Sequence, residues 1–248
     1  MNQVVKVLQN HATVRKFDPN HTISKEVQDE IIKASKQAPS WMNGQAYSIL
    51  TFQEENEKRK LIEVLNQDQE NSSNAKIIES SSLFLLFCID FSRYDLEHEG
   101  VSFENELEPL IIGTTDASLA LENALVAAES FELGTCVIGG LRRVSKEIID
   151  CLEINEFRFP LVGLAIGKPL QTAVPKPRLP EKATVFSGQN AHKKATKEEI
   201  KAYERQLQDY AKENGYTSEP WISRFTNYYK EQNYPAKTAE SLKKQKLI

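Results

Sequence analysis

Four short segments of this chain are almost continuously apolar, and they restrict its fold more than any other feature. They are YSILTF at residues 47–52, SLFLLFCID at 82–90, TCVIGG at 135–140 and FPLVGLAIG at 159–167. A strand with one face in water alternates apolar and polar residues, whereas a strand covered on both faces does not. The four segments therefore predict a sheet with helices on both faces. The residues alone leave open whether its strands are parallel or antiparallel.

Helical patterns lie between these segments. Ser24 is of a residue type that favours N-caps, and we expect a helix from there to about Lys36. A charged amphipathic helix is expected at 54–65. Ser145 is expected to cap a shorter helix that ends near Leu152.

The segment DASLALENALVAAESFEL, residues 116–133, is the most informative of the predicted helices. Asp116 is expected to begin it and Gly134 to end it, because these residue types are typical caps. Its apolar residues lie on most of its circumference, so we expect it to be buried on nearly every side. Such a helix lies either in the core of a subunit or at an interface between subunits.

The composition changes after Gly167. The segment KPLQTAVPKPRLP holds four of the ten prolines, which predicts an ordered loop or an extended arm. Residues 181–248 are polar but keep an aromatic density that predicts a helical arm packed on another surface. We therefore expect a domain at 1–180 and a C-terminal arm at 181–248, which packs on that domain or on a partner subunit.

Composition argues against several classes of protein. The chain has 248 residues, of which 40% are hydrophobic, so it has enough apolar side chains for a substantial core. Its formal net charge of −4 argues against nucleic-acid binding through overall charge. No apolar run is long enough to span a bilayer and the first residues do not resemble a signal peptide, so we expect a cytoplasmic protein without membrane association.

Missing motifs argue against chemistry by the protein's own side chains. The three cysteines form no CxxC pair and no cluster with histidine, so we expect buried thiols and no metal site. The sequence contains no GxGxxG after a strand, no P-loop, no HExxH and no GxSxG. If the protein is an enzyme, a bound organic cofactor is the expected source of its chemistry, and we expect no catalytic side chain.

Four separated stretches supply groups that suit an anionic, planar cofactor. They are HATVRKF at 11–17, APSWMNGQAYSIL at 38–50, VIGGLRR at 137–143 and KPRLP at 176–180. His11, Lys176 and Arg178 can neutralise a phosphate group. Gly139 and Gly140 allow backbone N–H groups to approach a ligand closely.

In this order and spacing, the four stretches resemble the nitroreductase superfamily. Within it they are most similar to the branch of oxygen-insensitive NADPH nitroreductases and NADPH-dependent flavin reductases. The resemblance implies an α+β fold, with a mostly antiparallel sheet flanked by helices. It also implies a homodimer with one FMN in each of two clefts at the subunit interface.

The resemblance implies a role for each matching position. His11 and Thr13 would bind the phosphate and ribityl end of FMN, and Arg15 would reach the N1/O2 edge of its ring system. Lys176 and Arg178 would clamp the phosphate. Three further sets would contact the ring: the loop residues Pro39, Ser40, Trp41 and Met42 of the second subunit, Gln69, and the backbone of Ile138, Gly139, Gly140 and Leu141.

The same branch uses arginines of the C-terminal arm to recognise NADPH. Here the corresponding stretch, KENGYTSEPW, holds only Lys212 as a basic residue. Lys201 and Arg205, one helical turn apart, are the expected compensating cations. We therefore expect NADPH or NADH as electron donor, with a preference for NADPH of about tenfold.

The expected function is an FMN-dependent NAD(P)H oxidoreductase. Hydride would pass from the nicotinamide through flavin N5 to nitro compounds, quinones or free flavin in ping-pong turnover. One alternative is a flavin-binding storage or sensing protein with little turnover. Another is an interaction protein whose cofactor site is vestigial.

Overall fold

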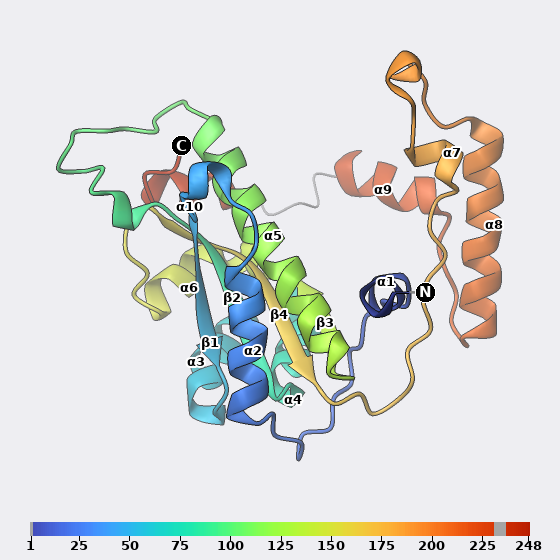
Figure 1. Ribbon diagram of the computed structural model, residues 1–248, viewed down its shortest axis with the longest axis horizontal. Coiled ribbons are helices and arrows are strands. Elements are labelled where there is room, and N and C mark those ends of the chain that lie inside the picture. The colour runs from blue at the N-terminus through green and yellow to red at the C-terminus, as the bar shows by residue number, and fades with distance from the viewer. Residues whose placement is uncertain (1, 231–236) are drawn as a thin grey trace. The chain divides into compact units, whose positions relative to one another are not determined.

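The computed structural model describes residues 2–230 and 237–248, and its contacts divide the chain into two compact units (Figure 1). Unit 1 is Met1–Ala173 together with Pro235–Ile248, and unit 2 is Val174–Tyr234. The predicted domain boundary at 180/181 stays a prediction. Unit 2, as the contacts define it, begins at Val174.

Unit 1 is built on a four-stranded antiparallel sheet in the order β1-β2-β4-β3. The strands are β1 (Tyr47–Phe52), β2 (Leu83–Asp90), β3 (Gly134–Ile138) and β4 (Arg158–Gly167). Every predicted strand is present, and the antiparallel α+β fold implied by the resemblance is confirmed. The third strand ends at Ile138, because Gly139 and Gly140 lead directly into the short helix η4 (Gly140–Val144).

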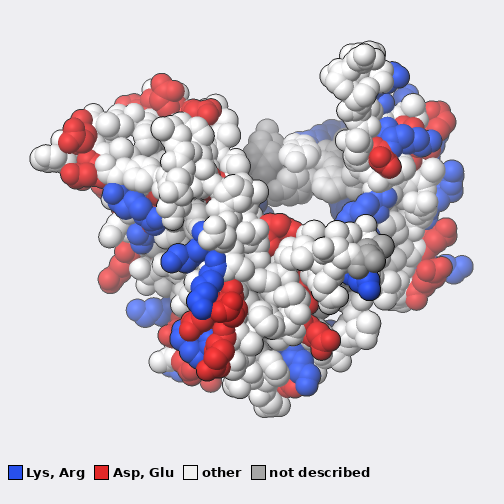
Figure 2. Space-filling view, viewed as in Figure 1, with Lys and Arg blue, Asp and Glu red and all other residues white. Residues whose placement is uncertain are grey.

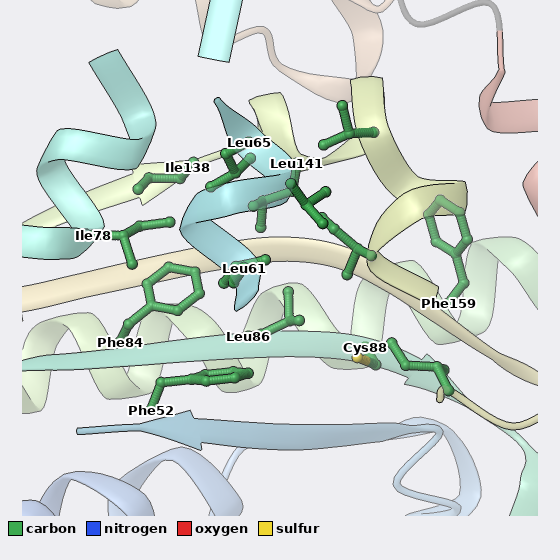
Figure 3. Close-up of a cluster of buried hydrophobic side chains, with 14 of the residues drawn as sticks. Phe52, Leu61, Leu65, Ile78, Phe84, Leu86, Cys88, Ile138, Leu141 and Phe159 are labelled. Atoms are coloured by element: carbon green, nitrogen blue, oxygen red, sulfur yellow. The ribbon is translucent and has the colours of Figure 1, made fainter. Parts of the chain in front are cut away.

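Alternate side chains of β2 enter two hydrophobic clusters, one on each face of the sheet. Leu83, Leu85 and Phe87 join the cluster of α2 (Lys25–Lys36) and α5 (Glu108–Ser130). Phe84, Leu86 and Cys88 join the cluster of α3 (Glu55–Leu65), α4 (Ser72–Ser80), α6 (Ser145–Cys151) and α10 (Thr238–Lys244). Figure 3 shows Leu61 and Leu65 of α3, with Ile78 of α4, packed over Phe84 and Leu86. Helices therefore cover both faces, which explains why the strands do not alternate.

The predicted helix ends are confirmed at α2 and wrong at α6. The Ser24 side chain accepts a hydrogen bond from Val27 N, as an N-cap does. Ser145 lies inside α6, whose N-cap is Val144, and its hydroxyl donates instead to the Ser241 hydroxyl at 2.8 Å. This bond fixes α10, from the end of the chain, onto α6.

The long helix α5 differs from its prediction at both ends and in its burial. It begins at Glu108, with a proline in its first turn, and it ends at Ser130. Asp116 is therefore a buried residue in its middle, while Gly134 begins β3. Gly113 lies inside the helix at a point where α5 packs closely on β2. A Cβ at this position would come within 2.5 Å of Ile89 Cγ2.

One stripe of α5 faces the sheet and the opposite stripe is exposed. The buried stripe consists of Gly113, Asp116, Ala117, Ala120, Leu121, Ala124, Leu125 and Ala128. The exposed stripe includes Ile111 and Leu119. The expectation of burial on nearly every side is thus wrong within one subunit. Of the described helices, α5 alone has the length and apolar composition of a membrane span, and its buried stripe identifies it as a core helix.

A buried carboxylate at the end of β2 binds side chains from the neighbouring segments. Asp90 is fully buried, and its oxygens accept from the Ser92 hydroxyl at 2.6 Å and from Arg158 Nε at 2.9 Å. Arg93 Nη2 lies 3.3 Å from the same carboxylate and also donates to the Tyr47 carbonyl. The cluster joins β1, β2 and β4 by charge-assisted hydrogen bonds.

Unit 2 contains α7 (Glu181–Thr184), α8 (Lys197–Glu213) and α9 (Trp221–Lys230). Its aromatic side chains pack on one another, with Trp221 edge-on to Tyr203 at 5.6 Å and to Phe225 at 5.2 Å between ring centroids. The Tyr203 and Tyr210 hydroxyls of α8 donate to the carbonyls of Pro177 and Val174. These bonds hold the proline-rich segment against α8.

Charges of both signs are interspersed on the face drawn in Figure 2, without a large region of either sign. A binding function on this face must therefore depend on local groups of side chains.

Candidate functional site

The loop that carries His11, Thr13 and Arg15 runs along the outer edge of β3. Val14 N donates to the Thr135 carbonyl at 2.8 Å, and Phe17 forms a bridge with Pro169 just beyond β4. Arg15 is exposed and lies near the Cys136 thiol. Burial raises the pKa of this thiol, and the positive charge of Arg15 partly opposes that rise. The loop therefore places two of the predicted cofactor-binding cations beside an edge strand.

His11 pairs with Glu129, which is held in turn by Thr135. Its Nδ1 lies 2.7 Å from Glu129 Oε1, and the Thr135 hydroxyl donates to the same oxygen at 2.6 Å. Glu129 is in the last turn of α5 and Thr135 is on β3. This pairing was not predicted, because Glu129 is 118 residues from His11 in the sequence.

Residues near Gln69 lie against the segment that leaves β3. Asn71 Nδ2 donates to the Gly140 carbonyl at 3.0 Å, and Arg143 Nε lies 2.6 Å from Asp68 Oδ2. A Cβ at Gly140 would come within 2.4 Å of Asn71 Oδ1, so a larger residue here would displace the Asn71 side chain. Gln69, in η2 (Gln69–Asn71), is exposed beside these contacts.

The edge formed by β3 and η4 is suited to a flat ligand. Ile138 and Leu141 are buried and belong to the core, so the segment between them can present only its backbone and the two glycines. Val137 is 45% exposed although it is apolar. The loop of His11, Thr13 and Arg15 is thus attached at the start of β3, and the segments of Gly139 and Gln69 lie against each other just beyond its end.

Pro39, Ser40, Trp41 and Met42 belong to a different part of unit 1. Asp116, in the middle of α5, accepts from Trp41 N at 3.1 Å and from Ala46 N at 3.0 Å. Thirteen residues of α5 separate Asp116 from Glu129, which is about 20 Å along the helix. One subunit therefore does not bring this loop together with His11.

The loop at 40–46 is held in a strained conformation with its large side chains outward. Met42, Asn43 and Gln45 have positive φ angles of 49°, 56° and 55°. Non-glycine residues adopt this region only where surrounding contacts enforce it. Trp41 is 58% exposed and Met42 is 80% exposed. Within one subunit, the loop therefore leaves these two apolar side chains exposed to solvent.

Unit 2 has a cavity of about 270 Å³ in which cationic and aromatic groups meet. Lys176 and Arg178 line it together with Arg224, Tyr203, Tyr216 and Trp221, and Glu219 is its one carboxylate among the lining residues. Lys176 Nζ lies 5.9 Å from the centre of the Tyr216 ring. The cavity has more cations than carboxylates, and its walls are partly aromatic. This combination suits a phosphate attached to an organic group.

The other predicted cations of unit 2 lie elsewhere. Lys201, Arg205 and Lys212 are exposed on α8, whereas Tyr203 and Leu207 of that helix face the cavity. Arg224, Thr217 and Ser218 line the cavity and were not predicted. The signal for Arg224 was its position in an amphipathic aromatic helix, one turn after Trp221.

The described residues include no group of histidine, cysteine, aspartate or glutamate that is suited to a metal ion. Burial raises the pKa of the Cys88 thiol to about 12, so this sulfur stays protonated at neutral pH. Cys88 is therefore a core residue rather than a nucleophile.

Comparisons with known proteins identify the relatives of this chain. The model of the nitroreductase family matches residues 8–85, and the model of that family's C-terminal domain matches residues 176–248. The FMN reductase (NAD(P)H) of Bacillus subtilis is 34% identical, over 95% of this chain and 94% of the relative. The CR(VI) reductase of Pseudomonas sp. is 33% identical, over 94% of each chain.

Solved structures are similar over nearly the whole chain. NfrA2 of B. megaterium superposes with a TM-score of 0.84 at 32% identity, covering 99% of this chain and 98% of its own. The NADPH:FMN oxidoreductase from Vibrio harveyi, solved in complex with NAD+, superposes with a TM-score of 0.85 at 27% identity and the same coverage.

Proposed function

The chain belongs to the nitroreductase family, and we propose that it is a homodimeric, FMN-dependent enzyme that uses NAD(P)H to reduce nitro compounds, quinones or free flavin. It is an oxidoreductase of the FMN reductase and nitroreductase type. One observation carries the finer proposal. His11 and Arg15 lie on the edge of the same strand that leads into Gly139 and Gly140, and Asn71 ties the segment of Gln69 to that glycine pair.

The residues of this edge fit FMN by the chemistry of their donors. His11 and Thr13 offer an imidazole and a hydroxyl for a phosphate and a ribityl chain. Arg15 offers a fixed positive charge. Val137 offers an exposed apolar side chain to a flat ring system, and Gly139 beside it has no side chain, although the Arg142 guanidinium lies close to Gly139. Lys176 and Arg178 of unit 2 are proposed to bind the phosphate as well.

The chemistry supplied by bound FMN is hydride transfer from a nicotinamide to an electron acceptor. The chain's own residues then have binding and electrostatic roles. The Arg15 guanidinium favours the more negative redox state of a flavin, because an opposite charge at close range stabilises the charged form. Trp41 and Met42, contributed by the partner subunit, exclude water from one side of the ring. No acid or base on the protein is required.

We further propose that the cavity of unit 2 binds a phosphate of the nicotinamide nucleotide through Arg224. Arg224 is the cavity cation that the FMN roles leave unused, and the hydroxyls of Thr217 and Ser218 lie beside it. Replacing Arg224 with Ala is expected to raise KM for NADPH about tenfold or more, with a smaller effect on NADH. Lys197→Ala, at the exposed start of α8, is the control and should leave both values within twofold. If Arg205→Ala has the larger effect, the nucleotide is bound by α8 and not by the cavity.

The proposed function is tested first by the colour and turnover of the purified protein. We expect a flavin absorption spectrum, one FMN per subunit released on denaturation, and rapid NADPH oxidation with a quinone, a nitroaromatic compound or free FMN as acceptor. A yellow protein that oxidises neither nicotinamide would indicate storage or sensing of flavin. A colourless protein that does not take up added FMN would contradict the proposed cofactor.

A further inference from the structure

Glu129 lies at a helix end whose surroundings disfavour a negatively charged carboxylate. It lies in the last turn of α5, where the helix dipole presents partial negative charge and where α5 has no basic residue. Its side chain is only 13% exposed, so water cannot fully solvate the carboxylate. Partners from other elements must therefore stabilise it.

Two donors converge on one oxygen of Glu129. His11 Nδ1 lies 2.7 Å from Oε1, and the hydroxyl of fully buried Thr135 donates to that atom at 2.6 Å. The Thr135 carbonyl also accepts from Val14 N. Thr135 therefore fixes both the Glu129 side chain and the loop that carries His11.

This geometry decides which nitrogen of His11 is protonated. A carboxylate can only accept, so the ring nitrogen that faces it carries the proton. The hydrogen bond made by one nitrogen of an imidazole sets the role left to the other. With Nδ1 occupied by Glu129, Nε2 is the atom that remains for a ligand, and a protonated ring offers it as an N–H donor.

We propose that Glu129 is a positioning residue for the cofactor phosphate, which it reaches through His11 and does not touch. The carboxylate holds the Nδ1 proton and the orientation of the ring, so that Nε2–H of protonated His11 donates to the phosphate of FMN. Thr135 holds the carboxylate in turn. This inference rests on the proposed function, because it assigns His11 to the FMN phosphate.

The first test concerns the apoprotein and needs no flavin. Nitrogen-15 NMR of the four histidine rings at alkaline pH, with His11 assigned by its loss in His11→Gln, reports which ring nitrogen of the neutral side chain carries the proton. We expect the neutral His11 ring to carry its proton on Nδ1, and to move it to Nε2 in Glu129→Ala. A His11 ring protonated on Nε2 in the unaltered protein would overturn the proposal.

The second test compares FMN with riboflavin, which lacks the phosphate. Glu129→Ala is expected to weaken FMN binding about tenfold, which corresponds to about 1.4 kcal/mol, and to change riboflavin binding less than twofold. In a His11→Gln background the same change should have less than a twofold effect on FMN, because Glu129 acts through His11. Equal losses for both flavins would show a merely structural role and contradict the proposal.

Two further variants complete this test. Glu132→Gln is the control, because Glu132 lines the same surface cavity as Glu129 but is exposed, and it should bind both flavins normally. Glu129→Gln keeps the shape and removes the charge, so it replaces Glu129→Ala if that variant does not fold. If His11→Gln leaves FMN binding unchanged, the proposed phosphate site is wrong, whereas the tautomer measurement still decides whether Glu129 orients His11.

Discussion

Arg15 follows Val14, whose N–H donates to Thr135 on β3, and its own side chain is exposed, so at the scale of the residue its role is electrostatic. Arg15→Met keeps an apolar stem of similar length and removes the charge. We expect the reduction potential of bound flavin to fall by on the order of 30 mV, which is about 1.4 kcal/mol for a two-electron couple. Potentiometric titration of the two proteins measures it. Lys16→Met, which removes the neighbouring exposed charge, should leave the potential unchanged. An unaltered potential in Arg15→Met would place its charge away from the flavin.

Asp90 is a residue whose effect on stability depends on pH. Burial opposes ionisation of its carboxyl, but hydrogen bonds from Ser92 and the charge of Arg158 outweigh that effect and hold its pKa below the ordinary value. A lowered pKa in the folded state adds stability that is present above about pH 4 and is lost as the pH falls through the folded-state pKa. Asp90→Asn should therefore lower the free energy of unfolding by about 3 kcal/mol at pH 7, and by less below pH 4.

Denaturant unfolding at several pH values measures this difference. The control is Asp150→Asn, which breaks an exposed pair with Lys244 at 2.6 Å and should cost less than about 1 kcal/mol. A loss in Asp90→Asn that is the same at pH 3 and pH 7 would show that the charge of Asp90 does not stabilise the fold.

At the scale of the element, α5 shows what the sequence could and could not predict. The four strands were predicted almost to the residue, because a strand buried on both faces leaves a continuous apolar run. The start of α5 was missed because Asp116 is a typical cap and Gly113 a typical breaker, and local propensity cannot reveal their tertiary partners. Asp116 serves the backbone of another loop, and Gly113 makes room for β2.

The mid-helix position of Asp116 makes α5 the anchor of the loop at 40–46. Asp116→Asn keeps one carbonyl oxygen but turns an NH₂ group toward a backbone N–H. We expect a loss of about 2 kcal/mol in the free energy of unfolding. Amide hydrogen exchange at Trp41 and Ala46 should become faster, because these N–H groups lose their acceptor. Ser118→Ala, on the exposed stripe of the same helix, should change neither quantity. Unchanged protection of both amides would mean that the strained loop is held without Asp116.

At the scale of the whole molecule, the candidate site was predictable only as a set of separate stretches. Chemistry identified His11, Arg15 and the glycine pair, and the resemblance gave their order. The residues that hold these stretches in place were not predicted. Glu129, Asn71 and Asp116 act across long stretches of sequence, and each is of a type that also occurs on ordinary surfaces. Arg224 was missed for the same reason, because its neighbours in the cavity come from three separate segments of unit 2.

The exposed apolar surface of unit 1 predicts that the subunit does not function alone. Ile111 and Leu119 on α5, Val4 and Leu8 on α1 (Gln3–Gln9), and Trp41 and Met42 are all large apolar side chains in contact with solvent. Apolar surface of this extent usually marks an interface. A homodimer would also overcome the distance between His11 and the loop at 40–46 within one subunit, because a second copy can bring its own loop to the flavin site.

We therefore expect an FMN-loaded dimer at micromolar concentration in sedimentation velocity. Leu119→Glu places a charge on the exposed stripe of α5 and should shift the protein toward monomer, with loss of FMN in parallel, because the partner's Trp41 and Met42 leave with the partner. Arg59→Glu, an exposed change on α3, should leave both association and FMN content intact. A Leu119→Glu monomer that keeps its FMN would separate the two properties, and would show that one subunit completes the flavin site by itself.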